Sequence, residues 1–398
     1  MYTLPPQDAK MEILDKTPFW IRPKGQQSEN LVSSALDDSP GGRLRELDGW
    51  RALSVLLVVL YHIGSYQHPS LLPHVLGLDR MVHNSGDLGV KIFFVISGFV
   101  ICRLLILEEF RYGSVSLKSF YYRRVFRILP ALYSYLFAVA ALLSLGLIHE
   151  QWKAILGSSL FLYDVNIPPW SWLVGHTWSL AVEEQFYLAF PALWILTPKR
   201  WKSRIFLGVC FLCTGWNLIA IHTGWDEFLW SHAREGFACI SCGVLMAIHE
   251  GRARTLAASV PAFVVGLAAL ALLAHPVGSH GWQAALYKGL VMPPAICLLL
   301  LFSLESRRGL RVFLCSKPMQ AVGLTSYGIY LWQQLFTAPK EFFAGTGVVI
   351  PFLLPLLCLI VPMSYLLIEQ PAMRYGKFLS RRARLSAEAR ALIIGRMA

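Results

Sequence analysis

The sequence has little charge for its length. Of its 398 residues, 15% are Asp, Glu, Lys or Arg, whereas 55% are hydrophobic, and the mean hydropathy is +0.50. These charged side chains are too few to cover the surface of a soluble domain of this size. The excess apolar surface needs lipid as its solvent, so the sequence predicts an all-α polytopic membrane protein.

Other features are also missing. Residues 1–42 are polar and rich in Pro and Ser, and they carry no apolar run long enough for a signal peptide. We therefore expect a mobile cytoplasmic N-terminal tail, with the first span acting as its own insertion signal. The rest of the chain shows no repeat at solenoid spacing and no low-complexity tract.

The net charge of +12 raises the question of a nucleic-acid partner. The basic residues, however, lie in short blocks between apolar runs. Such blocks hold loops on the cytoplasmic side of a membrane and need no anionic ligand. No nucleic-acid partner is expected.

The eight cysteines lie mostly inside apolar stretches. Cys210 and Cys213, and likewise Cys239 and Cys242, have the CxxC spacing of zinc and redox sites. Both pairs fall within predicted spans without nearby His or charged partners, which favours small apolar packing residues. We expect neither a metal site nor structural disulfides.

Ten apolar runs have about the length that a helix needs to cross a bilayer core of about 30 Å. They lie near 50–67, 86–107, 129–148, 176–197, 205–223, 233–249, 257–275, 284–303, 318–338 and 347–369. Basic clusters occupy alternate connections, which places that side, and with an even span count both termini, in the cytoplasm. We expect a multi-pass protein of the cytoplasmic (inner) membrane, with a membrane domain over 43–375 and a basic cytoplasmic C-terminal tail over 376–398. The Pro- and Trp-containing connection 149–175 fits a segment at the membrane interface.

Ionisable side chains inside these runs are candidate functional residues, because each is costly unless it meets a wet cavity or a partner. Arg51 and His62 are eleven residues apart, so they lie about 20° apart around a helix and about 16 Å apart along it. His62 is either a hydrogen-bonded packing residue or a functional one, and the face it shares with Arg51 and Asp48 keeps both explanations open. Asp48 is expected to start the helix and pair with arginine rather than to act as a catalyst.

Two further clusters lie in later runs. Arg124 and Arg127 share one helical face, and such a pair of guanidinium groups can bind phosphate. Taken alone, however, the pair is better explained as positive-inside anchoring of the helix end. Glu183 and Glu184 are adjacent in an apolar helix, and because neighbours point about 100° apart, only one of them is expected to face a cavity. A weaker cluster runs through 326–334 in the ninth run.

Five motifs in a fixed order make residues 43 to about 375 resemble the acyltransferase-3 family of membrane O-acyltransferases. They are Arg-x10-His at Arg51 and His62 in an LDGxRA opening, FFVISGF, RxxR at Arg124 and Arg127, WSLxxEEQFYL, and a closing Glu369-Gln370-Pro371. The resemblance implies about ten membrane helices. It also implies transfer of an acetyl group from cytoplasmic acetyl-CoA to a sugar hydroxyl.

The resemblance further implies roles for single residues. His62 is the expected general base, Arg51 the contact for CoA phosphate or the thioester carbonyl, and Glu183 the group that orients His62 or binds acceptor hydroxyls. Acetyl-CoA binding is expected at Arg51, Lys91, Arg124 and Arg127. Acceptor binding is expected at Ser97, Trp178, Glu184, Tyr330 and Trp332. An acetyl-histidine relay and direct attack both stay open.

One position departs from the family. Its usual YLWH reads Tyr330-Leu331-Trp332-Gln333 here, and a glutamine can hydrogen-bond but cannot carry protons. The departure puts in question a secondary role of this residue in positioning the acceptor, but not the core chemistry. No SGNH-type esterase domain is recognised, so a second soluble step is not expected from this chain.

The expected acceptor is a glycan or a lipid-linked saccharide, such as exopolysaccharide, O-antigen or lipo-oligosaccharide. Membrane lipid and polysaccharide-assembly proteins are the other expected partners. A transporter or flippase for a lipid-linked or small polar substrate explains the helix count and the buried polar groups as well, and a non-catalytic scaffold is a further alternative. Neither explains why the motifs occur together.

Overall fold

A computed structural model describes residues 44–64, 78–165, 171–224, 228–274, 281–305, 308–343 and 354–397. Within these residues the chain is all-helical, apart from one isolated bridge between Ile148 and Phe343. The expected N-terminal tail lies outside them, as does 166–170 in the connection predicted to lie at the interface.

The longer helices are α3 (Arg45–His62), α4 (Leu78–Tyr112), α5 (Leu117–Ser144), α8 (Thr177–Leu196), α9 (Lys199–Thr223), α10 (Phe228–Ile248), α12 (Ala262–Ala274), α14 (Met292–Leu304) and α19 (Gln370–Met397). The shorter ones are α6 (Trp152–Ser159), α7 (Trp172–Gly175), α11 (Glu250–Ser259), α13 (Trp282–Leu286), α15 (Arg308–Leu314), α16 (Lys317–Leu324), α17 (Ser326–Phe336) and α18 (Leu354–Ser364). Single turns of other helix types are η5 (Tyr163–Val165), η6 (Tyr287–Val291), η7 (Lys340–Phe342) and η9 (Tyr365–Glu369).

Several of these helices suit a bilayer. Five helical segments are long and apolar enough to cross one: Asn84–Tyr112, Leu117–Ser144, Lys199–Thr223, Trp282–Leu304 and Pro355–Leu385. A sixth results if Glu250–Ser259 and Ala262–Leu273, bent by 104°, form one broken span. Large apolar side chains stay exposed on the helices, among them Phe137, Leu188, Leu196 and Leu212. A helix satisfies its own backbone hydrogen bonds, so apolar helices of this length can lie in lipid. With several such helices, the chain is a multi-pass membrane protein.

Each of the ten predicted runs overlaps a helix, but not every such helix has the length or composition of a span. The first run, α3, carries four charged residues among its 18, Arg45, Glu46, Asp48 and Arg51. Others are short, since α12, α17 and α18 have 13, 11 and 11 residues. The count of ten crossings and the cytoplasmic position of both termini therefore stay predictions.

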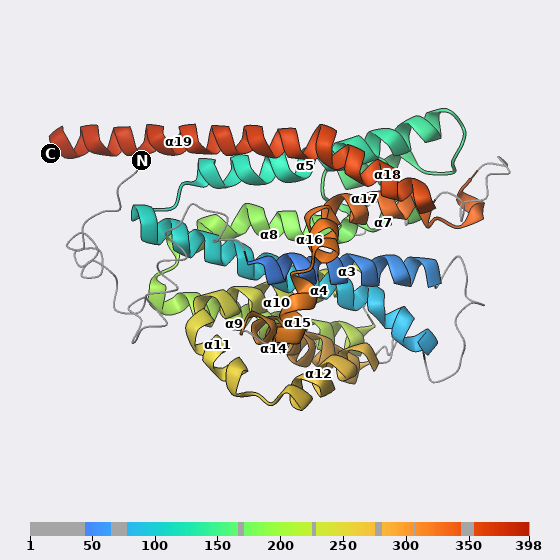
Figure 1. Ribbon diagram of the computed structural model, residues 1–398, viewed down its shortest axis with the longest axis horizontal. Helices are drawn as coiled ribbons and strands as arrows, with labels where there is room; N and C mark the ends of the chain where they lie inside the picture. Colours follow the sequence, from blue (N-terminus) through green and yellow to red (C-terminus); the bar gives the residue numbers. More distant parts are fainter. Residues whose placement is uncertain are drawn as a thin grey trace.

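Helix α4 packs against α3 and α10 in the middle of the bundle, whereas α19 lies along α5 at one edge (Figure 1). The contact between α4 and α10 is at backbone distance. A Cβ atom at Gly98 would overlap the carbonyl oxygen of Ile240, and one at Gly243 would overlap that of Val95. Small residues permit such an approach, and it fixes the wall of α4 that carries Ser97.

Replacement of Gly98 by alanine is expected to destabilise the protein by about 1–3 kcal/mol, because the added methyl group forces the two helices apart. The measurement is the melting temperature of the purified, detergent-solubilised protein. Gly208→Ala on α9 is the matched control, since a Cβ there meets nothing within 4 Å. Alanine is a better helix former than glycine by about 1 kcal/mol, so the control should melt no lower than wild type. Equal melting of the two variants would contradict the close contact.

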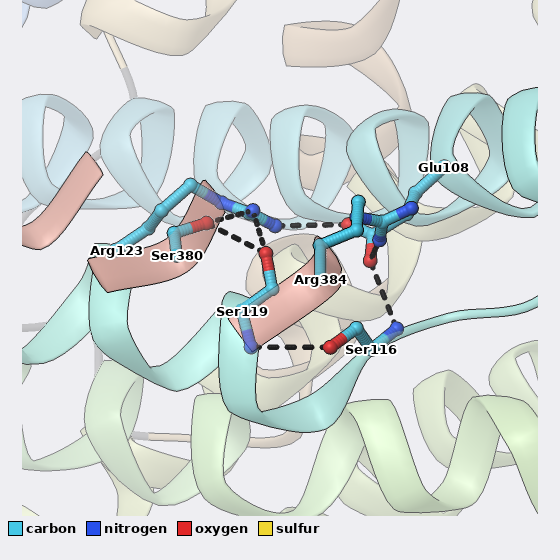
Figure 2. A network of polar contacts seen from close by, with 6 residues as sticks. All are labelled: Glu108, Ser116, Ser119, Arg123, Ser380 and Arg384. Carbon is cyan, nitrogen blue, oxygen red and sulfur yellow. Dashed lines mark hydrogen bonds and ion pairs between the residues drawn. The ribbon is translucent and has the colours of Figure 1, made fainter. Parts of the chain in front are cut away.

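The C-terminal helix is held by a polar network around Glu108 of α4 (Figure 2). The buried carboxylate accepts hydrogen bonds from the Ser116 N–H at 2.9 Å and from the Arg123 guanidinium at 2.9 Å. It also pairs with Arg384 of α19. One side chain thus joins α4, the start of α5 and α19.

A pair of serines completes this network. The hydroxyls of Ser119 and Ser380 are 2.6 Å apart, and Arg123 donates to both, at 2.5 and 2.8 Å. The segment expected as a basic tail, 376–398, is therefore a continuation of α19 through Met397 that begins by packing on α5.

Candidate active site

A cavity of about 80 Å³ lies between α3, α4, α5, α8 and α17. Its polar side chains are Arg51, Ser97, Arg124, Arg127, Ser179, Glu183, Tyr187, Ser326, Tyr327 and Tyr330. Six of these were assigned a role from the sequence: Arg51, Ser97, Arg124, Arg127, Glu183 and Tyr330. The space holds a few water molecules or a small acyl group, so a larger donor would extend beyond it.

Helical spacing explains how α8 supplies its part of the wall. Ser179, Glu183 and Tyr187 follow one another at intervals of four residues, which puts them on one face of the helix. Glu184 points elsewhere and does not line the cavity. The expectation that only one of the adjacent carboxylates faces a cavity agrees with this arrangement.

Three guanidinium groups converge on the cavity. Arg127 is close enough to Arg51 and Arg124 to interact with both electrostatically. Arg124 lies over the ring of Tyr187, 4.7 Å from its centroid. Arg51 also forms an ion pair with Asp48 at 3.4 Å, the pairing role expected for that carboxylate. Like charges gathered this closely favour the binding of an anion.

Glu183 is fixed within the same wall. Its carboxylate accepts hydrogen bonds from the hydroxyls of Ser97 on α4 and Tyr187 on α8, and these two hydroxyls are 3.0 Å apart. Within the described part of the chain, Glu183 makes no hydrogen bond to His62. The geometry therefore associates Glu183 with the cavity and its hydroxyl groups.

His62 does not line the cavity. Its half-buried ring lies edge-on to Trp172, with 5.4 Å between ring centroids, and to Tyr61 at 5.0 Å. The side chain of Gln333 approaches the ring, and the Nδ1 atom is buried without a partner among the described residues. The glutamine at the position of the family's usual histidine is thus a neighbour of His62.

Lys91 also lies outside the cavity lining, in a buried cluster of charges. Its fully buried ammonium pairs with Glu235 at 2.6 Å and lies 3.7 Å from Asp87. Lys288 lies 3.8 Å from each of these carboxylates. The ligand atoms of Asp87, Glu235 and His232 lie within 4.8 Å of one another, which is close enough to hold a metal ion. Because two lysines already balance two carboxylates, we assign this cluster to ion pairing between helices.

The remaining predicted binding residues are also outside the lining. Trp178 packs edge-on against Phe94 and His232, at centroid distances of 6.0 and 5.5 Å. Trp332 packs against Tyr135 at 5.5 Å, and its Nε1 atom is buried without a partner among the residues described. Neither tryptophan is brought to the arginine cavity.

Sequence reasoning placed His176, Ser179 and Tyr187 in the cluster around Glu183 but assigned none of them a role. Ser179 and Tyr187 could have been found from their four-residue spacing around Glu183. His176, which lies beside His62, carries no such signal because the two are more than a hundred residues apart in the chain. Its position follows only from the packing of α3, α7 and α17.

The chain was compared with known proteins. A family model described as an acyltransferase domain matches residues 44–369. Similar relatives include the peptidoglycan O-acetyltransferase OatA of Listeria monocytogenes, 28% identical over 319 residues that make up 72% of this chain and 48% of the relative. The O-acetyltransferase OatA of Staphylococcus aureus is 26% identical over 369 residues, or 83% of this chain and 57% of the relative.

This chain thus spans about half the length of these two relatives. No solved structure matches it. The family match begins at the first residue described before α3 and ends at Glu369, so it includes every helix that lines the cavity. The chain belongs to the acyltransferase-3 family of membrane acyltransferases.

Proposed function

We propose that this protein moves an acetyl group from acetyl-CoA to a hydroxyl of a glycan. The observation that carries the proposal is the convergence of Arg51, Arg124 and Arg127 on one cavity. CoA is a polyanion, and guanidinium forks bind phosphate with two parallel hydrogen bonds. The names of the relatives support an acetyl group and a glycan acceptor, and they make peptidoglycan the first acceptor to test.

In the proposed reaction, His62 takes the proton of the acceptor hydroxyl while that oxygen attacks the thioester carbonyl. A carbon–oxygen bond forms, the carbon–sulfur bond breaks, and His62 returns the proton to the leaving CoA thiolate. About 16 Å of helix separates Arg51 from His62, so we assign Arg51 to the charged part of the donor. The pantetheine arm then covers the distance to His62.

We place the protein in the cytoplasmic membrane, with ten crossings and both termini in the cytoplasm. In this orientation the basic residues of α19 lie on the cytoplasmic side, and we expect acetyl-CoA to reach the arginine cavity from there. A C-terminal reporter that fluoresces only in the cytoplasm should be fluorescent in cells. A dark, full-length fusion would reverse the orientation.

The function is tested with the purified chain in lipid nanodiscs, radiolabelled acetyl-CoA and a panel of glycans. The panel contains peptidoglycan fragments, exopolysaccharide, O-antigen and lipo-oligosaccharide. An acetyltransferase produces a labelled, base-labile ester on one of them, whereas a transporter or a scaffold produces none. Absence of labelled ester throughout the panel would refute the proposal.

Arg124→Lys is expected to raise the KM for acetyl-CoA about tenfold or more, without a matching change in the acceptor KM. Lysine keeps the charge but loses the bidentate fork, and its ammonium cannot stack on the Tyr187 ring as a planar guanidinium can. Hydrogen bonds to charged groups contribute about 1.5–3 kcal/mol, and 1.4 kcal/mol corresponds to a factor of ten. Arg252→Lys, on the exposed surface of α11, is the matched control. An unchanged donor KM in Arg124→Lys would remove Arg124 from donor binding.

A further inference from the structure

A second group of buried polar atoms lies next to the arginine cavity. His176 immediately precedes α8 and is only 5% exposed. Neither of its ring nitrogens makes a well-formed hydrogen bond within the described residues, although the Leu331 backbone approaches the ring. Buried imidazole nitrogens are normally satisfied, so a full set of partners for this ring is missing among the described residues.

The ring of His176 lies near that of His62, so a ligand that bonds His176 would also lie close to His62. The two histidines are close enough to interact electrostatically, and the Nδ1 atom of His62 is also buried without a partner among the described residues. The His176 ring is enclosed by Tyr135 and Tyr330, at centroid distances of 5.5 and 5.4 Å. Three ring nitrogens of two neighbouring histidines thus lack a well-formed hydrogen bond among the described residues, and each can donate to or accept from a hydroxyl group.

This region is separate from the arginine cavity but adjacent to it. Tyr330 lines the cavity, and its hydroxyl donates to the backbone carbonyl of His176 at 2.9 Å. The same hydroxyl lies 2.6 Å from that of Ser179, another cavity residue. His176 therefore lies directly behind the cavity wall, on the side of His62.

The chemistry of the two regions differs. The cavity presents three guanidinium groups, whereas the surroundings of the histidines are aromatic and uncharged, with Trp172 against His62 and Tyr135 against His176. A saccharide offers hydroxyl groups and apolar C–H faces, which suit neutral hydrogen-bonding groups and aromatic rings. The phosphates of a CoA ester suit the guanidinium groups instead.

We propose that His62, His176 and Gln333 form the acceptor subsite, in which His176 binds a hydroxyl of the saccharide beside the one that His62 deprotonates. A neutral imidazole has one donor and one acceptor nitrogen, and a hydroxyl group can meet either. His176 is then an acceptor-binding residue that does not itself move the proton. This inference rests on the proposed function.

The test uses a peptidoglycan tetrasaccharide with the full-length protein in nanodiscs. Its Kd is measured by tryptophan fluorescence in the absence of a donor, and its KM is measured in the transfer assay. His176→Phe keeps an aromatic ring between the two tyrosines but removes both nitrogens. It should raise the Kd and the KM of the tetrasaccharide at least about tenfold and leave the KM of acetyl-CoA unchanged. His176→Asn, which restores one donor and one acceptor, should recover part of the affinity and replaces the phenylalanine variant if that variant does not fold.

His249→Phe is the matched control, because this histidine bonds Ser203 at 3.0 Å beside α11 and lies outside both regions. Wild-type acceptor affinity in folded His176→Phe would overturn the subsite and leave the proposed function standing, as would a rise confined to the donor KM. Saccharide binding that depends on His176, without transfer by the wild-type protein to any glycan of the panel, would support the subsite and overturn the proposed function. A wild-type protein that neither binds nor acetylates the tetrasaccharide would overturn the subsite as stated, while the glycan panel decides the function independently.

Discussion

Replacement of His62 by alanine is expected to slow acetyl transfer by about 10²- to 10⁴-fold, the range that a general acid–base group contributes. The variant loses the only imidazole of α3, next to Trp172 and His176. The rate is measured with radiolabelled acetyl-CoA at saturating donor and acceptor. A loss under these conditions is a loss in kcat and not in binding.

The variant must be present and folded for this result to count. His62 is half-buried and its ring contacts are at the end of a helix, so we expect normal membrane abundance and a single peak in size-exclusion chromatography. His249→Ala removes an exposed imidazole that bonds Ser203 outside both polar regions, so this control variant should transfer at the wild-type rate. Undiminished transfer by abundant His62→Ala protein would remove His62 from the reaction.

Lys91→Met is expected to destabilise the protein by about 3–5 kcal/mol, the cost of leaving a buried charge without its partner. In the wild-type cluster, Lys91 and Lys288 balance Asp87 and Glu235. Methionine leaves two carboxylates against one ammonium, at a place where the lysine is fully buried. The free energy of unfolding is measured by titration with denaturing detergent in mixed micelles.

The double variant Lys91→Met and Glu235→Met is the control for this result. It leaves one ammonium and one carboxylate, Lys288 and Asp87, so it should recover most of the lost stability. The same pair of measurements tests the role in acetyl-CoA binding that the family resemblance suggested for Lys91. A single variant of normal stability with a raised donor KM would return Lys91 to the donor site.

The helices and part of the site could be predicted from the sequence because both depend on local periodicity. Apolar runs of sufficient length become helices in lipid whatever lies beside them. Arg124 and Arg127 face the same cavity because they are three residues apart, and Glu183 faces it without Glu184 because neighbours on a helix diverge. The structure adds contacts between motifs that spacing cannot predict, such as the electrostatic interaction between Arg127 and the closing Glu369.

The parts that could not be predicted depend on which helices meet. The ion pair of Lys91 with Glu235 could not be predicted, because the two residues lie 144 positions apart in the chain. Arg51 and His62 share a helical stripe, yet only Arg51 reaches the cavity, since Trp172 and Gln333 pack around the other end of α3. The boundary at residue 375 followed the extent of the family motifs and the basic residues after Arg374, and neither reveals that α19 runs on through Met397 or that its Arg384 pairs with a buried carboxylate of α4.

The ion pair between Arg384 and Glu108 limits how far the C-terminus can be truncated. The family match stops at Glu369, fifteen residues before the arginine that pairs with Glu108. A fragment that ends at Glu369 would lack Arg384. The buried carboxylate of Glu108 would then keep one of its two arginine partners, Arg123. Arg123 lies on α5, the helix that carries both arginines of the RxxR motif. We therefore expect the matched region alone to be less stable than the longer chain, and expression designs should retain α19 at least beyond Arg384.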